Sequence, residues 1–122
     1  MHDDMKLSET IVGEQMGLGD GEVASAANAI RQLRITIDKV DAAIIRLLAQ
    51  RFAATDQVGG LKAQAGFAPA DPAREQEQRE QLRTLSLEAG LDPAIAEQYH
   101  AFVASLAKER HAQAAQRANS EG

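Results

Sequence analysis

The sequence predicts an all-α fold in which each chain forms three helices, one long and two shorter. Three observations predict this class. Apolar residues recur at steps of three and four over a long stretch, as on one face of a helix. The sequence Asp-Pro-Ala, which is typical of a helix start, occurs at Asp71 and again at Asp92. No segment shows the alternation of apolar and polar residues that is typical of a strand.

The long helix is expected over about residues 26–64. Its spacing continues past the pair Gly59-Gly60, because Leu61 resumes the pattern. A helix of about 38 residues measures roughly 57 Å, whereas a compact domain of this size has a radius of gyration of only ~13 Å. Such a helix needs a partner outside its own chain. Its apolar positions are Ile30, Leu33, Ile37, Val40, Ile44, Leu47, Leu48 and Val58.

The two shorter helices are expected to follow a loop at residues 66–70. One begins at Asp71 and ends at Gly90, a residue that favours the end of a helix. The other begins at Asp92 and ends near Gln113. Its apolar face contains Ile95, Tyr99, Phe102, Val103 and Leu106.

Flexible segments are expected on both sides of this helical domain. Residues 1–24 contain four glycines and no sustained helical period, so they are interpreted as a flexible arm. Residues 116–122 are polar and are expected to form a disordered tail. The helical domain therefore covers residues 25–115.

The composition excludes several classes of protein. The chain contains no cysteine, which excludes disulfides and thiolate metal sites, and its net charge of −5 argues against nucleic acid as a partner. No apolar run reaches the ~18 residues that suggest a membrane span. The acidic N-terminus lacks the order of a signal peptide, so the cytoplasm is the expected location. Aromatic residues make up only 3 %, which predicts a thin core and a partner subunit.

Three basic residues lie on or beside the apolar face of the long helix. Arg51 and Lys62 are eleven residues apart, almost a whole number of turns, so they point the same way. Their Cα atoms would be roughly 16 Å apart, a span over which two long side chains can hold a small dianion. Arg34 lies roughly 25 Å from Arg51 along the axis. It is therefore expected to serve the site of another subunit.

The start of the second helix is polar throughout residues 74–81. Leu82 and Leu85 share a face with Arg74 and Gln78, and this face is suited to closing a polar pocket over the long helix. Each basic residue alone is also compatible with a surface position or an ion pair. Burying several cations without an anion is costly, so the set predicts an anion-binding pocket in a helical dimer.

The spacing of these residues resembles that of the AroQ-class chorismate mutases. The similarity covers roughly residues 30–113 and requires no gap from Arg34 to Asp92. It includes Leu91-Asp92 at the start of the third helix. The motifs that carry it are Leu33-Arg34-x-x-Ile37-Asp38-x-x-Asp41, Leu47-Leu48-x-x-Arg51, Val58-Gly59-x-x-Lys62 and Asp71-Pro72-Ala73-Arg74-Glu75.

The resemblance implies an intertwined homodimer that converts chorismate into prephenate in phenylalanine and tyrosine biosynthesis. The long first helices cross, and each active site takes an arginine from the other subunit. Arg51 and Arg34 of the partner subunit would bind the two carboxylates of the substrate, and Lys62 would reach its ether oxygen and a carboxylate. Asp71 and Arg74 would line the ring side, and Glu75 would accept a hydrogen bond from the ring hydroxyl. The rearrangement is pericyclic, so no metal or cofactor is expected; the protein restricts the substrate's conformation and stabilises negative charge.

One position departs from the family's pattern. His111 stands where family members place a glutamine or glutamate that donates a hydrogen bond to the ether oxygen. An imidazole N–H can donate this bond, but a histidine in the last turn also favours the helix dipole, and both interpretations stay open. Glu109 and Gln113 lie close by along the chain, and His2 and His100 are expected to lie outside the site.

Other functions on the same scaffold are an isochorismate-pyruvate lyase and a 4-amino-4-deoxychorismate mutase. Glu75 argues against the lyase, because a partner for the ring hydroxyl suits chorismate, but a carboxylate also accepts from an amine. An alternative of another class is a non-catalytic helical dimer that regulates an enzyme of the aromatic pathway. In that case residues 1–24 are the expected contact with the partner enzyme.

Overall fold

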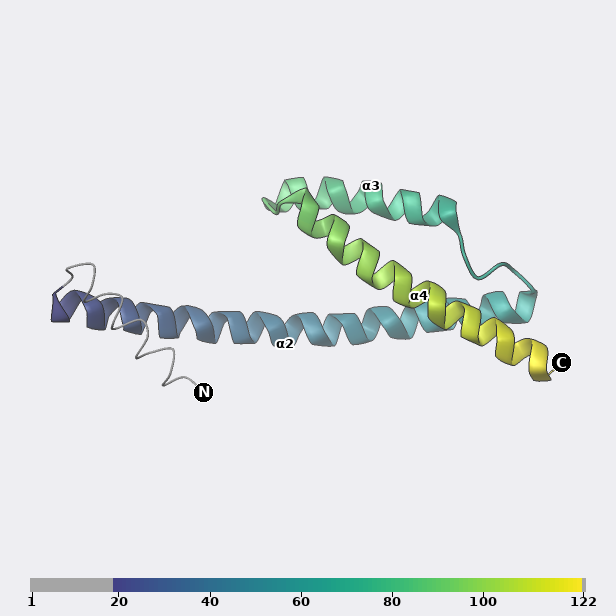
Figure 1. Ribbon diagram of the computed structural model, residues 1–122, viewed down its shortest axis with the longest axis horizontal. Coiled ribbons are helices and arrows are strands. Elements are labelled where there is room, and N and C mark those ends of the chain that lie inside the picture. Colours follow the sequence, from purple (N-terminus) through teal and green to yellow (C-terminus); the bar gives the residue numbers. More distant parts are fainter. Residues whose placement is uncertain (1–18, 122) are drawn as a thin grey trace. The chain divides into compact units, whose positions relative to one another are not determined.

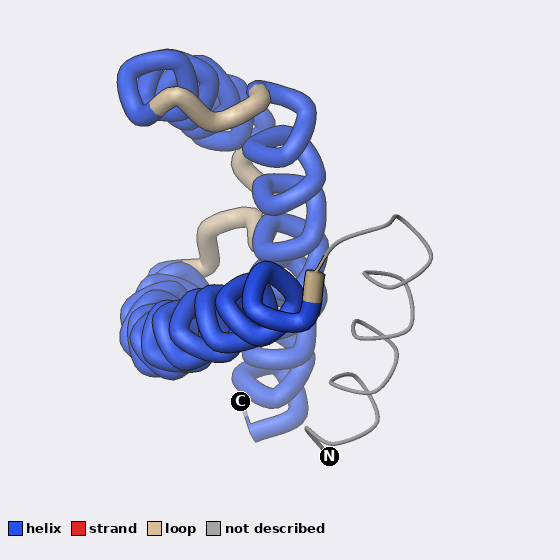
Figure 2. Tube along the Cα trace, turned by 90° about the vertical axis from the view of Figure 1, so that its left-hand side faces the viewer, coloured by secondary structure: helices blue, strands red, loops and turns tan. Residues whose placement is uncertain are grey.

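The protein forms three helices, which confirms the fold class expected from the sequence. The structure, a computed structural model, describes residues 19–121, and these contain α2 (Asp20–Ala65), α3 (Pro72–Ala89) and α4 (Pro93–Glu121) (Figure 1). Short loops join the helices, and no strand occurs within residues 19–121 (Figure 2). None of these helices has the length and apolar character needed to cross a membrane. Most of the predicted arm, with His2, lies outside the described residues.

The helix starts have the capping geometry that the Asp-Pro-Ala signals predict. The Asp71 side chain accepts a hydrogen bond from the backbone amide of Arg74, with an oxygen–nitrogen distance of 3.1 Å. The Asp92 side chain accepts one from the backbone amide of Ala94 at 3.0 Å. A proline follows each aspartate, where its missing N–H leaves no hydrogen bond unmade. Both predicted starts are therefore confirmed.

Glycines in the left-handed conformation end the first two helices. Gly66 follows α2 with φ of +74°, and the backbone amide of Phe67 donates to the Lys62 carbonyl oxygen at 2.8 Å. Gly90 follows α3 with φ of +73° and donates into the last turn of that helix. A side chain would strain the backbone at these two positions, which explains why glycine stands there.

Two helix boundaries differ from the sequence prediction. The first helix begins at Asp20, so residues 20–24 of the predicted arm are helical; Asp20 and Glu22 in its first turn favour the positive end of the helix dipole. The last helix continues past Gln113 to Glu121. The prediction of a disordered tail is therefore wrong for residues 116–121. Alanines and the absence of proline or glycine before Gly122 explain why this segment stays helical.

Contacts divide the chain after Leu47 into two units. The described part of the first unit is the N-terminal portion of α2, and the second unit holds the rest of α2 with α3 and α4. Within the second unit, α3 and α4 pack as a helical hairpin (Figure 1).

An ion pair joins α4 to α2 within the second unit. Arg110 Nε donates to Asp56 Oδ1 at 2.7 Å, and the guanidinium lies 5.8 Å from the centroid of the Phe52 ring. The hydrogen bond from Arg110 holds the pKa of Asp56 below its ordinary value, and the same bond raises the pKa of Arg110. Since both side chains are exposed, this pair orients the helices more than it stabilises them.

Few apolar side chains are buried in the described part of the chain. They are Val23, Ala27, Ala96 and Val103, and of these only Val103 is fully buried. Many large apolar side chains are exposed on the described helices, including most of the predicted apolar face of the first unit. This pattern agrees with the thin core expected from the composition. The exposed residues include Leu33, Ile35, Ile37, Val40, Ile44, Ile45 and Leu47 in the first unit, and Leu85, Leu87, Ile95, Tyr99 and Phe102 in the second.

Candidate functional site

Most of the predicted site residues line a cavity of about 160 Å³ in the second unit. Its walls come from the C-terminal part of α2, the following loop, the first half of α3 and the middle of α4. Every residue that the sequence assigned to the site lines it, except Arg34, which belongs to the first unit. The lining residues are Arg51, Thr55, Val58, Lys62, Pro69, Asp71, Arg74, Glu75, Gln78, Ala104, Ala107, Lys108 and His111.

One face of α2 forms one wall of the cavity. Arg51, Thr55, Val58 and Lys62 follow one another at steps of four, three and four residues, which is the helical repeat. The glycines at 59 and 60 do not interrupt this helix. Arg51 and Lys62 therefore line the same cavity, as their eleven-residue spacing predicts.

Arg51 carries a hydrogen-bond donor that has no acceptor in the described structure. Its Nη1 atom is buried and makes no hydrogen bond there. Removing a charged donor from water without a partner is costly, so this atom requires an acceptor that a ligand can supply. An anion entering the cavity satisfies that requirement.

The other charged groups of the cavity have protein partners. Lys62 Nζ donates to the Pro69 carbonyl oxygen at 3.3 Å, which leaves two of its three N–H donors for a ligand. Lys108 Nζ lies 3.0 Å from Glu75 Oε1, close enough for an ion pair, although this buried oxygen receives no hydrogen bond of good geometry. Arg74 pairs with Glu77, the residue one turn further along α3.

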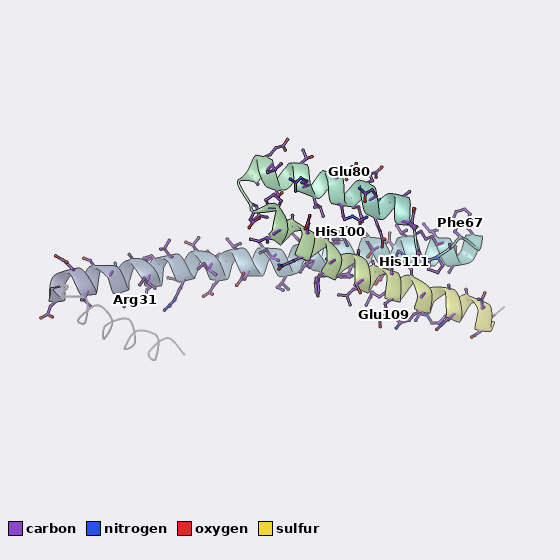
Figure 3. The ribbon with its side chains drawn as sticks, turned by 45° about the horizontal axis from the view of Figure 1, so that its top comes forward. Arg31, Phe67, Glu80, His100, Glu109 and His111 are labelled. Carbon is purple, nitrogen blue, oxygen red and sulfur yellow. The ribbon has the colours of Figure 1, made fainter. Side chains whose placement is uncertain are left out.

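His111 is buried in the cavity wall with both ring nitrogens against backbone carbonyl oxygens. Its Nε2 lies 2.7 Å from the Thr55 oxygen, and its Nδ1 lies 3.4 Å from the Pro69 oxygen. A carbonyl oxygen only accepts, so neither of these contacts leaves a ring nitrogen facing open space in the cavity. Glu109, which Figure 3 labels on α4, and Gln113 are exposed and do not line this cavity.

Gly59 makes room for this histidine, and its replacement by alanine is expected to destabilise the protein. A Cβ atom at position 59 would lie 2.5 Å from His111 Cδ2, too close for any carbon pair. We expect the free energy of unfolding to fall by about 1–3 kcal/mol, as for other overpacked sites. Urea denaturation of Gly59→Ala measures the change.

Gly60 supplies the matched control for that substitution. A Cβ atom at position 60 meets nothing within 4 Å, so Gly60→Ala is expected to stabilise the helix by about 1 kcal/mol. Equal effects of the two substitutions would contradict the close packing of His111 on Gly59.

A second buried histidine lies behind the cavity. His100 is 4 % exposed, and its Nε2 lies 3.3 Å from Oε1 of Gln78, a cavity residue. Burial lowers the pKa of His100, and the nearby Arg79 lowers it further. Figure 3 labels His100 and His111 on α4. From the sequence, His100 is expected to lie outside the site. It does not line the cavity, but it contacts Gln78, a residue that does.

The lowered pKa of His100 gives stability a pH dependence. The unfolded chain binds a proton at the ordinary pKa of about 6.5, whereas the folded chain binds one only at lower pH. Stability is therefore complete above that value and is expected to fall as the pH decreases through it. Thermal midpoints recorded from pH 8 to pH 5 for the wild type and His100→Gln measure the effect. A wild-type midpoint that falls no more steeply than that of the variant would contradict this origin.

Three polar residues that line the cavity were not predicted from the sequence as site residues: Thr55, Gln78 and Lys108. The position of Gln78 could have indicated this, because it lies four residues after Arg74, on the same face of the polar start of α3. For Lys108 the only signal in the sequence was its position one turn before His111 on the same helix.

The all-helical fold and a cavity lined by several basic groups are suited to binding a small anionic molecule. The chorismate mutase type II family model matches residues 33–112, and the chain belongs to this family, the AroQ class. The protein is accordingly an isomerase with chorismate mutase activity. No curated protein matches the sequence at a significant level.

Proposed function

We propose that this cavity converts chorismate into prephenate by a [3,3] rearrangement. The observation that carries the proposal is the buried Nη1 of Arg51, which lacks an acceptor within the described residues and lines the same cavity as Lys62. A substrate carboxylate supplies that acceptor. The charge-assisted bond that forms is stronger than a bond between neutral groups.

The rearrangement breaks one C–O bond and forms one C–C bond in a single step, without proton transfer. The protein's task is to hold the flexible dianion in a compact shape, which removes part of the entropic barrier. Negative charge grows on the ether oxygen as the C–O bond breaks. The Lys62 ammonium, with two N–H donors left by its bond to Pro69, is the group proposed to stabilise that charge.

The start of α3 is proposed to bind the ring of the substrate. Glu75 carries a buried oxygen without a hydrogen bond, which suits acceptance from the ring hydroxyl. Asp71 caps the helix and lines the cavity together with Arg74, so both are proposed to contact the ring side.

The role of His111 depends on which of its contacts persists with a ligand bound. Donation to the ether oxygen, which the resemblance implies, requires that one ring nitrogen leaves its carbonyl oxygen. With both contacts kept, His111 shapes the cavity by joining α4 to α2 and to the loop before α3. We favour this second role, because the Nε2 contact at 2.7 Å is short.

We further propose that the protein works as an intertwined homodimer in which Arg34 completes the site of the partner subunit. Apolar side chains exposed along the first unit need cover, and a second copy of the same face supplies it. Arg34 is half-buried on this helix, 17 residues before Arg51. That separation is too long for one small molecule to touch both residues of the same helix.

The proposal is tested by following the loss of chorismate absorbance with purified protein and resolving the products by chromatography. Prephenate formed at a rate far above the uncatalysed reaction would support the proposed reaction. Isochorismate and 4-amino-4-deoxychorismate are assayed in parallel. Faster turnover of either would reassign the substrate, and no turnover of all three would favour the regulatory dimer.

A further inference from the structure

Gln78 holds an amide group in the cavity that no role above uses. It lies on α3, one turn after Glu75, and is half-buried. Its Oε1 accepts a hydrogen bond from His100 Nε2 at 3.3 Å. The Gln78 amide nitrogen makes no hydrogen bond among the described residues, so its two N–H donors remain for a ligand.

His100 determines which end of this amide faces the cavity. The imidazole is 4 % exposed and contacts the side-chain oxygen of Gln78 across the α3–α4 hairpin. An Nε2–H group donates to Gln78 Oε1 whether the ring is neutral or protonated, which leaves the NH2 group for the cavity.

Neutral donors are otherwise scarce in this cavity. Both ring nitrogens of His111 face backbone oxygens, and Ala104 and Ala107 offer no polar group from α4. A dianion with two carboxylates and an ether oxygen has more acceptor sites than Arg51 and Lys62 alone can satisfy.

We infer that Gln78 is a substrate-binding residue, whose NH2 group donates a hydrogen bond to an acceptor oxygen of the bound dianion, and that His100 is its positioning residue. This inference rests on the proposed function, because it concerns the same cavity and the same substrate. It adds a neutral donor from α3 to the cations of α2.

Replacement of Gln78 by leucine removes the donor and keeps the side-chain volume. We expect kcat/KM for chorismate to fall roughly 10- to 100-fold, as for the loss of one well-placed neutral donor. Gln81 is an exposed glutamine on the same helix that does not line the cavity, so Gln81→Leu is the matched control and should keep wild-type activity.

Gln78→Glu separates donation from a merely structural role. At neutral pH the carboxylate lacks a donor and repels the dianion, so activity is expected to be lower than that of Gln78→Leu. As the pH decreases, the carboxyl gains a proton and becomes a donor again, so the activity of this variant alone should rise. Other titratable or charged groups face or adjoin the same cavity, which is why wild type and Gln78→Leu are measured over the same range. These groups are Arg51 and Lys62 on α2, Asp71, Arg74, Glu75 and Arg79 at α3, and His100, Lys108 and His111 on α4.

The positioning role of His100 is tested by pairing substitutions. His100→Leu should lower kcat/KM, and His100→Gln, which keeps an N–H donor, should restore part of the loss. In the double variant Gln78→Leu/His100→Leu, the loss should not exceed that of Gln78→Leu alone, because the two residues act through one hydrogen bond. Additive losses would show that His100 acts independently.

The outcomes distinguish this inference from the proposed function. If wild type turns over chorismate and both Gln78 variants keep its kcat/KM, Gln78 is not a binding residue and the proposed function stands. If wild type does not turn over chorismate, the proposed function fails, and a titration with the dicarboxylate adipate decides the inference. In that case the Gln78 side-chain amide signals, assigned by their loss in Gln78→Leu, should shift in ¹H–¹⁵N spectra. Signals that stay in place while the Arg51 Nε signal shifts would overturn it.

Discussion

Replacement of Arg51 by alanine is expected to lower kcat/KM for chorismate about a thousandfold or more. The substitution removes the partner of a substrate carboxylate in a partly desolvated site, where breaking a charge pair costs about 3–5 kcal/mol. The affected atom is the buried Nη1, for which the described structure offers no other acceptor. Loss of chorismate absorbance over a wide range of substrate concentrations measures the change.

The same substitution should not destabilise the ligand-free protein. A buried donor without an acceptor opposes folding, so its removal is expected to leave the thermal midpoint unchanged or to raise it. Circular dichroism checks that the helices persist. Arg51→Lys should show intermediate activity, because lysine keeps the charge without the planar fork. Arg46→Ala, an exposed arginine on the same helix, is the control. Wild-type turnover by Arg51→Ala would remove the assignment of the site.

Two inactive variants are expected to regain activity when their subunits exchange. Arg34→Ala retains Arg51, and Arg51→Ala retains Arg34, so a mixed dimer contains one site with both arginines and one with neither. With free exchange at equal concentrations, half of the dimers are mixed, and about one quarter of all sites are complete. Activity should therefore rise from near zero to roughly a quarter of the wild-type value.

Subunit exchange has to be shown independently of activity. Mixed dimers carrying two different affinity tags are isolated in sequence on both tags, and their turnover is compared with each parent. Active mixed dimers would support the proposed cross-subunit arginine. Inactive mixed dimers of proven composition would contradict this cross-subunit assignment and would mean that each site needs Arg34 and Arg51 from the same chain.

Local signals in the sequence were sufficient for the helices and for the residues that share a helical face. Asp71 and Asp92 cap their helices, and Gly90 ends α3, because capping depends on residues within one turn. The common face of Arg51 and Lys62 follows from the helical repeat alone. The prediction ended the last helix near Gln113, because the residues that follow are polar. In the structure α4 continues to Glu121, since the alanines of this segment favour helix.

Contacts between residues far apart in the sequence could not be predicted from such local signals. His100 and Gln78 are 22 residues apart and meet only because α3 and α4 pack together. His111 contacts the carbonyl oxygens of Pro69 and Thr55, which precede it by 42 and 56 positions in the sequence. Every residue has a backbone carbonyl, so the side chains at these positions give no sign of the contacts. The spacing could place His111 in the cavity wall, but its hydrogen bonds depend on the path of the backbone.

The two contacts made by the Pro69 carbonyl oxygen affect which substitutions the loop between α2 and α3 can tolerate. Lys62 Nζ and His111 Nδ1 both approach this one oxygen, at 3.3 and 3.4 Å. A main-chain oxygen is supplied by any residue whose backbone follows the same path, so the side chain at position 69 can vary without loss of either contact. What has to be preserved is the course of the chain, which proline fixes through its restricted φ. For protein engineering, the neighbouring positions 67, 68 and 70 are therefore suitable for new side chains, provided that Pro69 and the length of the loop are kept.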